Sequence, residues 1–185
     1  MAIGGLHGTG KTTYAESLAQ SFSLRHVSAG AAFRKLAEDE GLTLSELACR
    51  AETDPSIDRR IDEAVRREAE IGSVVVDGQL AAWMAGDYAD LKIYLTAPER
   101  VRFERIALRD GLTLQEAERQ TRIREEREAH RFRELYGIDV KDLSVYHLIV
   151  DTSLLSLEDT MKTLKNIVSD YIQEMERRRR SDVGG

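Results

Sequence analysis

The strongest constraint on the fold is a glycine-rich run close to the start of the chain. Gly5-Leu6-His7-Gly8-Thr9-Gly10-Lys11-Thr12 fits the spacing G-x-x-x-x-G-K-[ST], between a short apolar segment and a helical pattern that begins near Thr13. Such glycines let the backbone curl around phosphate oxygens, and the following helix adds the partial positive charge of its N-terminus. We therefore expect Gly5 to Thr13 to bind ATP, with Lys11 at the β- and γ-phosphates and the Thr12 hydroxyl on Mg²⁺.

Composition narrows the classes of function. The chain has 185 residues and is 42% hydrophobic, which suits one ordered domain. Its net charge of −6 argues against a nucleic acid or a membrane surface as partner, and no apolar run approaches the roughly 18 residues of a membrane span. The single cysteine, Cys49, and the lack of room for a leader before the glycine-rich run favour the cytoplasm. We expect a cytoplasmic monomer.

Strand-like apolar segments alternate with helical patterns, which is typical of an α/β fold with a parallel sheet. The expected strands are residues 1–4, 25–28, 73–77, 91–95 and 147–151. Residues 29–72 are more than one crossover helix requires, so two or three helices are expected there. A second helical insertion, rich in arginine, precedes the fifth strand. Two such appendages suit a kinase with two substrates, although a larger helical layer is the alternative.

Polar residues follow the ends of two expected strands. Asp77 ends the third, where ligands gather in open α/β sheets, and its carboxylate can hold Mg²⁺ opposite Thr12. The alternative is a surface carboxylate that caps a turn with Gly78. The second strand leads into Ser28-Ala29-Gly30-Ala31-Ala32-Phe33-Arg34, in which Gly30 allows close approach and Phe33 and Arg34 offer an aromatic face and a cation. The alternative is that Phe33 packs in the core and Arg34 lies in solvent. Because the segment accompanies a phosphate loop, we interpret it as a site for the acceptor phosphate.

Arginine is the dominant cation in residues 100–133, which contain ten arginines, seven acidic residues and no lysine. Arg124, Arg127 and Arg131 have the i, i+3, i+7 spacing of one helix face, with Glu128 beside them. A salt-bridged face in solvent is the alternative, because glutamates are interleaved. Arginine grips phosphate with a planar fork, and phosphoryl transfer depends on charge neutralisation, so we expect these arginines to be catalytic.

Two further arginines, Arg105 and Arg109, follow the fourth expected strand and are candidates for contact with the donor phosphates. No catalytic base stands out among the candidate residues. A phosphate oxygen is already nucleophilic at neutral pH, whereas a sugar hydroxyl needs a positioned base. The absence of an obvious base therefore favours an acceptor that carries a phosphate.

Taken together, these motifs resemble the archaeal-type cytidylate kinases, which are P-loop nucleoside monophosphate kinases. The resemblance covers residues 3–164. Besides the phosphate loop it rests on further motifs, namely Ser28-x-Gly30-x-x-Phe33-Arg34, Asp77-Gly78 before Leu80-Ala81-x-Trp83-Met84, the Arg124 to Arg131 helix, Tyr136-Gly137-Ile138-Asp139 and Asp151-Thr152-Ser153.

The resemblance implies a P-loop NTPase fold in one domain, 1–185, with a five-stranded parallel sheet of order 2-3-1-4-5. The core would comprise residues 1–28, 73–109 and 144–180, with an acceptor-binding insertion at 29–72 and a short lid at 110–143. The implied reaction is Mg²⁺-dependent transfer from ATP to CMP or dCMP, giving CDP or dCDP.

The resemblance also implies roles for single residues. Ser28, Gly30 and Arg34 would hold the acceptor nucleotide, and Arg124 and Arg131 would bridge its phosphate and the transferred one. Glu128 would lie near the acceptor sugar. The loop Asp151 to Ser153 would pass near the donor adenine.

Gln79 departs from the family, in which an arginine usually follows the Asp-Gly pair. Glutamine can hydrogen-bond a pyrimidine edge but brings no charge, so the preference among CMP, dCMP and UMP stays open. Other P-loop kinases acting on AMP, UMP or a hydroxyl acceptor such as shikimate are alternatives. A nucleotide-dependent switch is another alternative, although the sequence has no Asn-Lys-x-Asp guanine motif. An RNA-associated nucleotidase is a further alternative.

Overall fold

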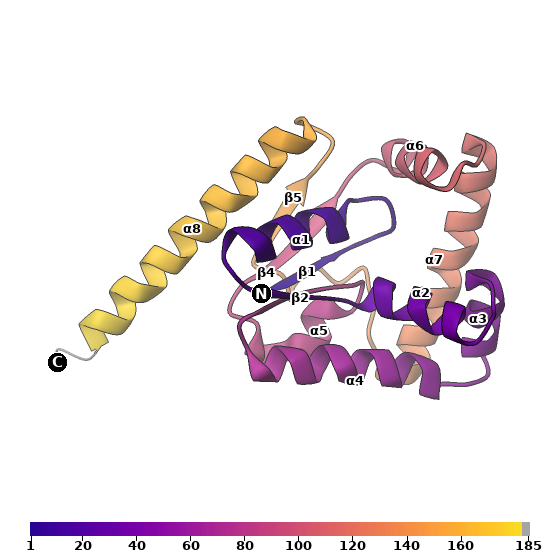
Figure 1. Ribbon diagram of the computed structural model, residues 1–185, viewed down its shortest axis with the longest axis horizontal. Helices are drawn as coiled ribbons and strands as arrows, with labels where there is room; N and C mark the ends of the chain where they lie inside the picture. Colours follow the sequence, from indigo (N-terminus) through magenta and orange to yellow (C-terminus); the bar gives the residue numbers. More distant parts are fainter. Residues whose placement is uncertain (183–185) are drawn as a thin grey trace.

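A five-stranded parallel sheet lies at the centre of the computed structural model, which describes residues 1–182 (Figure 1). The strands are β1 (Ala2–Gly5), β2 (Arg25–Ser28), β3 (Val74–Asp77), β4 (Lys92–Thr96) and β5 (Leu148–Asp151). They pair in the order β2-β3-β1-β4-β5, and every pair is parallel. The expected order is confirmed, and each expected strand is found to within one residue at its ends.

Helices cover both faces of the sheet, as the alternation of side chains along β1 requires. Ile3 packs with α1 (Lys11–Ser21) and α8 (Leu157–Asp182), through Leu18 and Leu164. Ala2 points to the other face, where α4 (Ser56–Ile71) and α5 (Ala81–Ala85) pack against it. The phosphate loop thus joins a fully buried strand to a helix fixed on the sheet.

Residues 29–72 form three helices, α2 (Ala29–Asp39), α3 (Leu44–Ala51) and α4, in agreement with the two or three expected. They share a small apolar core that includes Phe33, Leu47 and Ile61. A capping box at Thr43 and Glu46 starts α3. This segment therefore has a core of its own beside the sheet.

Two helices lie between β4 and β5, namely α6 (Glu99–Asp110) and α7 (Leu114–Tyr136), while the short 3₁₀ helix η1 (Gly86–Tyr88) precedes β4. The Thr113 hydroxyl accepts the Glu116 N–H at the start of α7, and Gly137, with φ of 67°, ends it. Figure 1 shows α7 running from the end of α6 along α2 and α3 to α4. One helix therefore connects the phosphate-loop end of the molecule with the 29–72 segment.

The helix α8 extends beyond the edge of the sheet, as Figure 1 shows. Over residues 1–182, no helix has both the length and the hydrophobicity that a bilayer crossing requires.

Candidate active site

The phosphate loop leaves β1 in a backbone conformation that requires glycine. Gly8 has φ of +79°, and a Cβ there would lie 2.5 Å from the carbonyl oxygen of Arg102. Gly5 has φ of +144°, and a Cβ there would lie 2.3 Å from the carbonyl oxygen of Leu95. The Thr9 hydroxyl donates to the Leu6 carbonyl at 2.9 Å and so closes the loop from within. The loop is therefore packed tightly against β4 and α6, with the N-terminus of α1 at its end.

Lys11 is the cation of the loop. Its Nζ donates a hydrogen bond to the Leu6 carbonyl oxygen at 2.8 Å. Burial lowers the pKa of this amine to about 8, against the opposing charges of Asp77 and Glu128. Burial removes the hydration that stabilises the charge of the Lys11 ammonium. A phosphate that binds beside it would stabilise that charge again.

Asp77, at the end of β3, is the carboxylate nearest to the start of α1 and is almost fully buried. Its Oδ1 accepts from the hydroxyls of Thr12 at 3.1 Å and Ser28 at 3.2 Å, and its Oδ2 lies 2.7 Å from Nε2 of His26. The predicted proximity of Asp77 to Thr12 is thus observed. A carboxylate and a hydroxyl are hard oxygen ligands, which fit Mg²⁺ when phosphate oxygens and water complete the shell. In residues 1–182, no group of three His, Cys, Asp or Glu side chains could hold a metal by itself.

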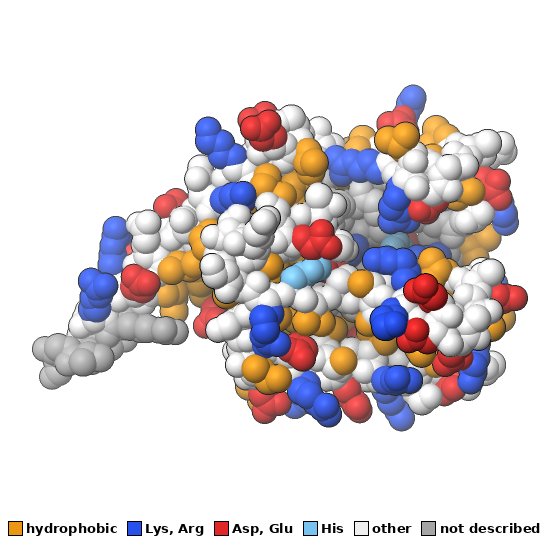
Figure 2. Space-filling model, viewed as in Figure 1, with side chains coloured by type: hydrophobic (Ala, Val, Ile, Leu, Met, Phe, Trp, Pro, Cys, Tyr) orange, Lys and Arg blue, Asp and Glu red, His pale blue; other side chains and the backbone are white. Residues whose placement is uncertain are grey.

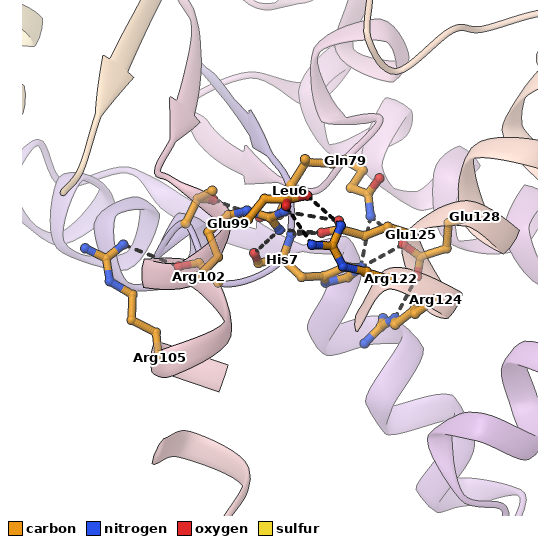
Figure 3. Close-up of polar contacts among 12 residues, drawn as sticks. Leu6, His7, Gln79, Glu99, Arg102, Arg105, Arg122, Arg124, Glu125 and Glu128 are labelled. Carbon is orange, nitrogen blue, oxygen red and sulfur yellow. Dashed lines mark hydrogen bonds and ion pairs between the residues drawn. The ribbon is translucent and has the colours of Figure 1, made fainter. Parts of the chain in front are cut away.

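An ion pair between α6 and α7 braces the other side of the loop (Figure 3). The Glu125 carboxylate accepts the His7 N–H at 3.1 Å and pairs with Arg102 Nη1 at 2.6 Å. The same guanidinium donates to the His7 carbonyl at 2.8 Å, and Arg102 is only 2% exposed. Both main-chain groups of His7 are therefore fixed by a buried charge pair.

One turn further along α7, Glu128 reaches the same loop. Its Oε2 lies 2.7 Å from Nε2 of His7 and accepts from the Gln79 amide, while its Oε1 pairs with Arg124 Nε at 2.8 Å. Burial works against the ionised form, but the contacts with His7 and Arg124 outweigh it and hold the pKa of Glu128 well below its ordinary value. Burial lowers the pKa of His7, while the charge of Glu128 opposes that shift. An ionised carboxylate is thus held between the loop and α7.

Other predicted residues lie around this centre. Arg105 donates to the carbonyl oxygens of Thr152, at 2.7 Å, and Gly8, at 3.3 Å, so it joins the loop after β5 to the phosphate loop. Arg131 forms a buried ion pair with Asp58 of α4, with 2.8 Å between Nε and Oδ2. The i, i+3, i+7 face of α7 is therefore not simply solvated, since Arg131 is buried.

Further predicted residues are found at the surface or in the apolar core. Arg127 pairs with Glu52 and Arg109 with Asp110, both at exposed positions. Thr13 and Arg34 are exposed, with Arg34 close to Gly30, whereas Phe33 is buried in the core of the 29–72 helices. Contact of these five side chains with a nucleotide stays a prediction.

Two buried polar atoms without a hydrogen-bond partner belong to candidate site residues. Within residues 1–182, Gln79 Oε1 and Arg131 Nη1 are such atoms, as are the hydroxyls of Tyr146 and Thr160. Unpaired buried polar atoms are rare because they lose their hydration. On the face shown in Figure 2, Lys and Arg side chains surround a recess between α6 and α2. These features fit an anionic ligand that also offers a hydrogen-bond donor.

Several contacts of the site are absent from the predictions made on sequence. His26 on Asp77, Arg102 with Glu125, and Asp58 with Arg131 join residues that lie 23 to 73 positions apart. The spacing of residues along the sequence does not predict contacts between residues so far apart. The one available signal is the position of Arg102 one helical turn before Arg105, in a helix packed beside the loop.

Sequence comparisons match nearly the whole chain. A family model described as the cytidylate kinase-like family matches residues 1–154. The cytidylate kinase of Staphylothermus marinus is 45% identical over 174 residues, covering 94% of this chain and 98% of the relative. The cytidylate kinase of Pyrococcus horikoshii is 40% identical over 186 residues, covering 100% and 96%.

Solved structures with the same fold are much less similar in sequence. A gluconokinase from Sinorhizobium meliloti superposes with a TM-score of 0.60 at 15% identity, over 96% of this chain and 95% of that one. A shikimate kinase from Acinetobacter baumannii in complex with shikimate gives a TM-score of 0.55 at 19% identity, over 91% and 92%. At these identities the likeness concerns the fold alone, which is that of the P-loop kinases.

Proposed function

The chain belongs to the cytidylate kinase-like family, and on that basis we propose that it transfers the terminal phosphoryl group of ATP to CMP or dCMP. The observation that carries the proposal is the juxtaposition of a Lys11 phosphate loop with Arg124 and Glu128 of α7 and with the unpaired amide oxygen of Gln79. The Lys11 loop suits the phosphates of a donor. Arg124 and Gln79 suit an acceptor that carries a phosphate and an amine.

On the donor side, Gly5 to Thr13 would surround the phosphates, and Lys11 would exchange the Leu6 carbonyl for phosphate oxygens. Thr12 and Asp77 would hold Mg²⁺, which when bound neutralises phosphate charge and orients the reacting group. The Arg105 contact to Thr152 supports a role for Arg105 in shaping the donor end of the site.

On the acceptor side, Gln79 Oε1 is a free acceptor for the exocyclic amine of cytosine, which uracil lacks. Ser28 ends β2, Gly30 lies in the first turn of α2 and Arg34 lies one turn further along that helix, where the acceptor would enter. Gly78, between Asp77 and Gln79, has Ala29 against its Cα, so the two strand ends are close together.

In the proposed reaction, the side chains position the two substrates and neutralise the charge of their phosphates. Phosphoryl transfer spreads charge over the transferred oxygens, and positioned Lys and Arg side chains stabilise that charge more strongly in the transition state. Arg124 and Arg131 would supply two such cations from α7. The acceptor phosphate is itself the nucleophile, so no side chain needs to remove a proton.

The proposal is tested by measuring ADP release from Mg·ATP with CMP, dCMP, UMP, AMP, GMP and shikimate as acceptors. Strong stimulation by CMP and dCMP is expected. Stimulation by another acceptor would keep the kinase and change its substrate. Slow ATP turnover that no acceptor stimulates would favour a nucleotide-dependent switch.

Gln79→Leu tests the contact to the base, because it removes the free amide oxygen and keeps a similar volume. Preference for CMP over UMP, measured as the ratio of kcat/KM values, should fall by about tenfold, the value of one lost hydrogen bond. An unchanged ratio would assign base selection to other residues.

A further inference from the structure

The ion pair between Asp58 and Arg131 is buried between α4 and α7. Arg131 Nε lies 2.8 Å from Asp58 Oδ2, and Nη2 lies 3.4 Å from Oδ1, so the carboxylate takes one edge of the guanidinium. The two side chains are 6% and 7% exposed. A buried ion pair rarely stabilises a fold more than apolar side chains of similar size, so its presence calls for another explanation.

The other edge of this guanidinium is unfilled. Arg131 Nη1 is buried and has no hydrogen-bond partner. A guanidinium has five N–H donors in a fixed planar fork, so fixing Nε and Nη2 also fixes the direction of Nη1. A buried charged donor without a hydrogen-bond partner destabilises the free protein. When an anion binds, the same donor forms a charge-assisted hydrogen bond that stabilises the complex.

The position of this edge fits the acceptor rather than the donor. Arg131 lies three residues after Glu128, so it is on the same face of α7, about 4.5 Å further from the phosphate loop along the helix axis. Glu128 contacts His7 of the loop and Gln79 after β3. Asp58 belongs to α4, whose neighbours Ile57 and Ile61 pack in the core of the 29–72 helices. The pair thus lies where this segment meets α7.

We propose that Asp58 is a positioning residue for the acceptor phosphate: it holds Arg131 so that the free Nη1 edge faces the phosphate of the bound nucleoside monophosphate. Asp58 itself touches no substrate. It couples the 29–72 segment to α7 through one guanidinium, so that acceptor binding depends on both. This inference rests on the proposed function, because it assumes a nucleoside monophosphate as the acceptor.

Asp58→Asn tests the inference, since it keeps the shape of the side chain and removes the charge that orients Arg131. The KM for CMP and the Kd for CMP, measured by calorimetry without ATP, should rise about 10- to 100-fold, as expected for a misplaced charge-assisted contact. The KM for ATP should change less than twofold. Asp58→Glu should restore part of the CMP affinity.

Asp62→Asn is the matched control. Asp62 lies one turn further along α4 and also contacts α7, but through the Tyr136 hydroxyl at 2.8 Å. The CMP affinity of this variant should stay within twofold of the wild type. Asp58→Asn with unchanged CMP affinity, or with tighter binding because Asp58 competes with the phosphate, would overturn the inference.

A double-mutant cycle separates positioning through Arg131 from a general structural effect. Asp58→Asn should add nothing to the loss of CMP affinity caused by Arg131→Met, and additive losses would contradict the inference. If Asp58→Asn does not fold, the apolar pair Asp58→Leu/Arg131→Met is compared with Arg131→Met instead, because apolar replacement of a buried pair is tolerated.

The calorimetric measurement keeps this inference apart from the proposed function. Wild-type protein that binds CMP without transferring phosphate would refute the proposed function and would still allow the Asp58 test. Wild-type protein that binds no nucleoside monophosphate would refute both.

Discussion

The contribution of Asp62 to the stability of this protein should decline as the pH rises from about 4 to about 7. This carboxyl group is 8% exposed, and its Oδ2 accepts the Tyr136 hydroxyl. Burial raises the pKa of Asp62 from 3.8 to about 7, with Asp58 adding to the shift and Tyr136 and Arg131 opposing it. Between these values the folded state binds more protons than the unfolded state, so raising the pH favours unfolding.

The magnitude follows from the shift. A pKa raised from 3.8 to about 7 corresponds to an upper limit of about 4 kcal/mol, of which about 2–3 kcal/mol is lost between pH 5 and pH 8. An asparagine side chain at this position cannot ionise, and its amide oxygen can still accept from Tyr136. Relative to the wild type, Asp62→Asn should therefore gain up to about 2–3 kcal/mol of stability on going from pH 5 to pH 8, or about 5–10 °C in Tm.

Denaturant unfolding followed by circular dichroism at both pH values measures this gain. Glu63→Gln is the control, because it removes an exposed carboxylate from the same helix and should give the same stability difference at both pH values. A stability difference between Asp62→Asn and the wild type that is equal at pH 5 and pH 8 would refute the burial argument.

Three further predictions concern the phosphate loop and α7. Lys11→Ala should abolish phosphoryl transfer with little change in Tm, and near-normal turnover would refute the loop assignment. Arg124→Ala should lower kcat by at least ~10²-fold, because a charge-assisted contact in the transition state is lost; steady-state kinetics with saturating substrates measure this, and an unchanged kcat would return Arg124 to a structural role. Gly8→Ala should weaken ATP binding by about tenfold or more in calorimetry, because its φ of +79° and the Arg102 carbonyl at 2.5 Å both oppose a Cβ. Unchanged ATP affinity would show that the loop adapts.

Much of the fold could be predicted because its signals are local. The Gly5 to Thr12 run requires a strand before it and a helix after it, and the apolar segment ending at Asp77 has the composition of a buried parallel strand. The capping pair of Thr43 and Glu46, a motif only four residues long, marks the start of α3. The strand order itself came from the family resemblance rather than from these local signals.

The site could be predicted only in part. The sequence predicts that Asp77 faces Thr12, because Asp77 ends one parallel strand and the loop that leads to Thr12 leaves another at the same edge of the sheet, and their contact is observed. The partners of the arginines were not predictable, since Arg131 meets Asp58 at a separation of 73 residues. Helical spacing places Arg131 on a face, but tertiary packing decides whether that face meets solvent, a nucleotide or another helix.

The most direct test of phosphoryl transfer to CMP is to follow the label from [γ-³²P]ATP in the presence of Mg²⁺ and CMP. The proposed function predicts that the label appears in CDP at the rate at which ADP is formed, and that omission of CMP stops its release. Label that appears only in inorganic phosphate, at a rate independent of CMP, would contradict the account.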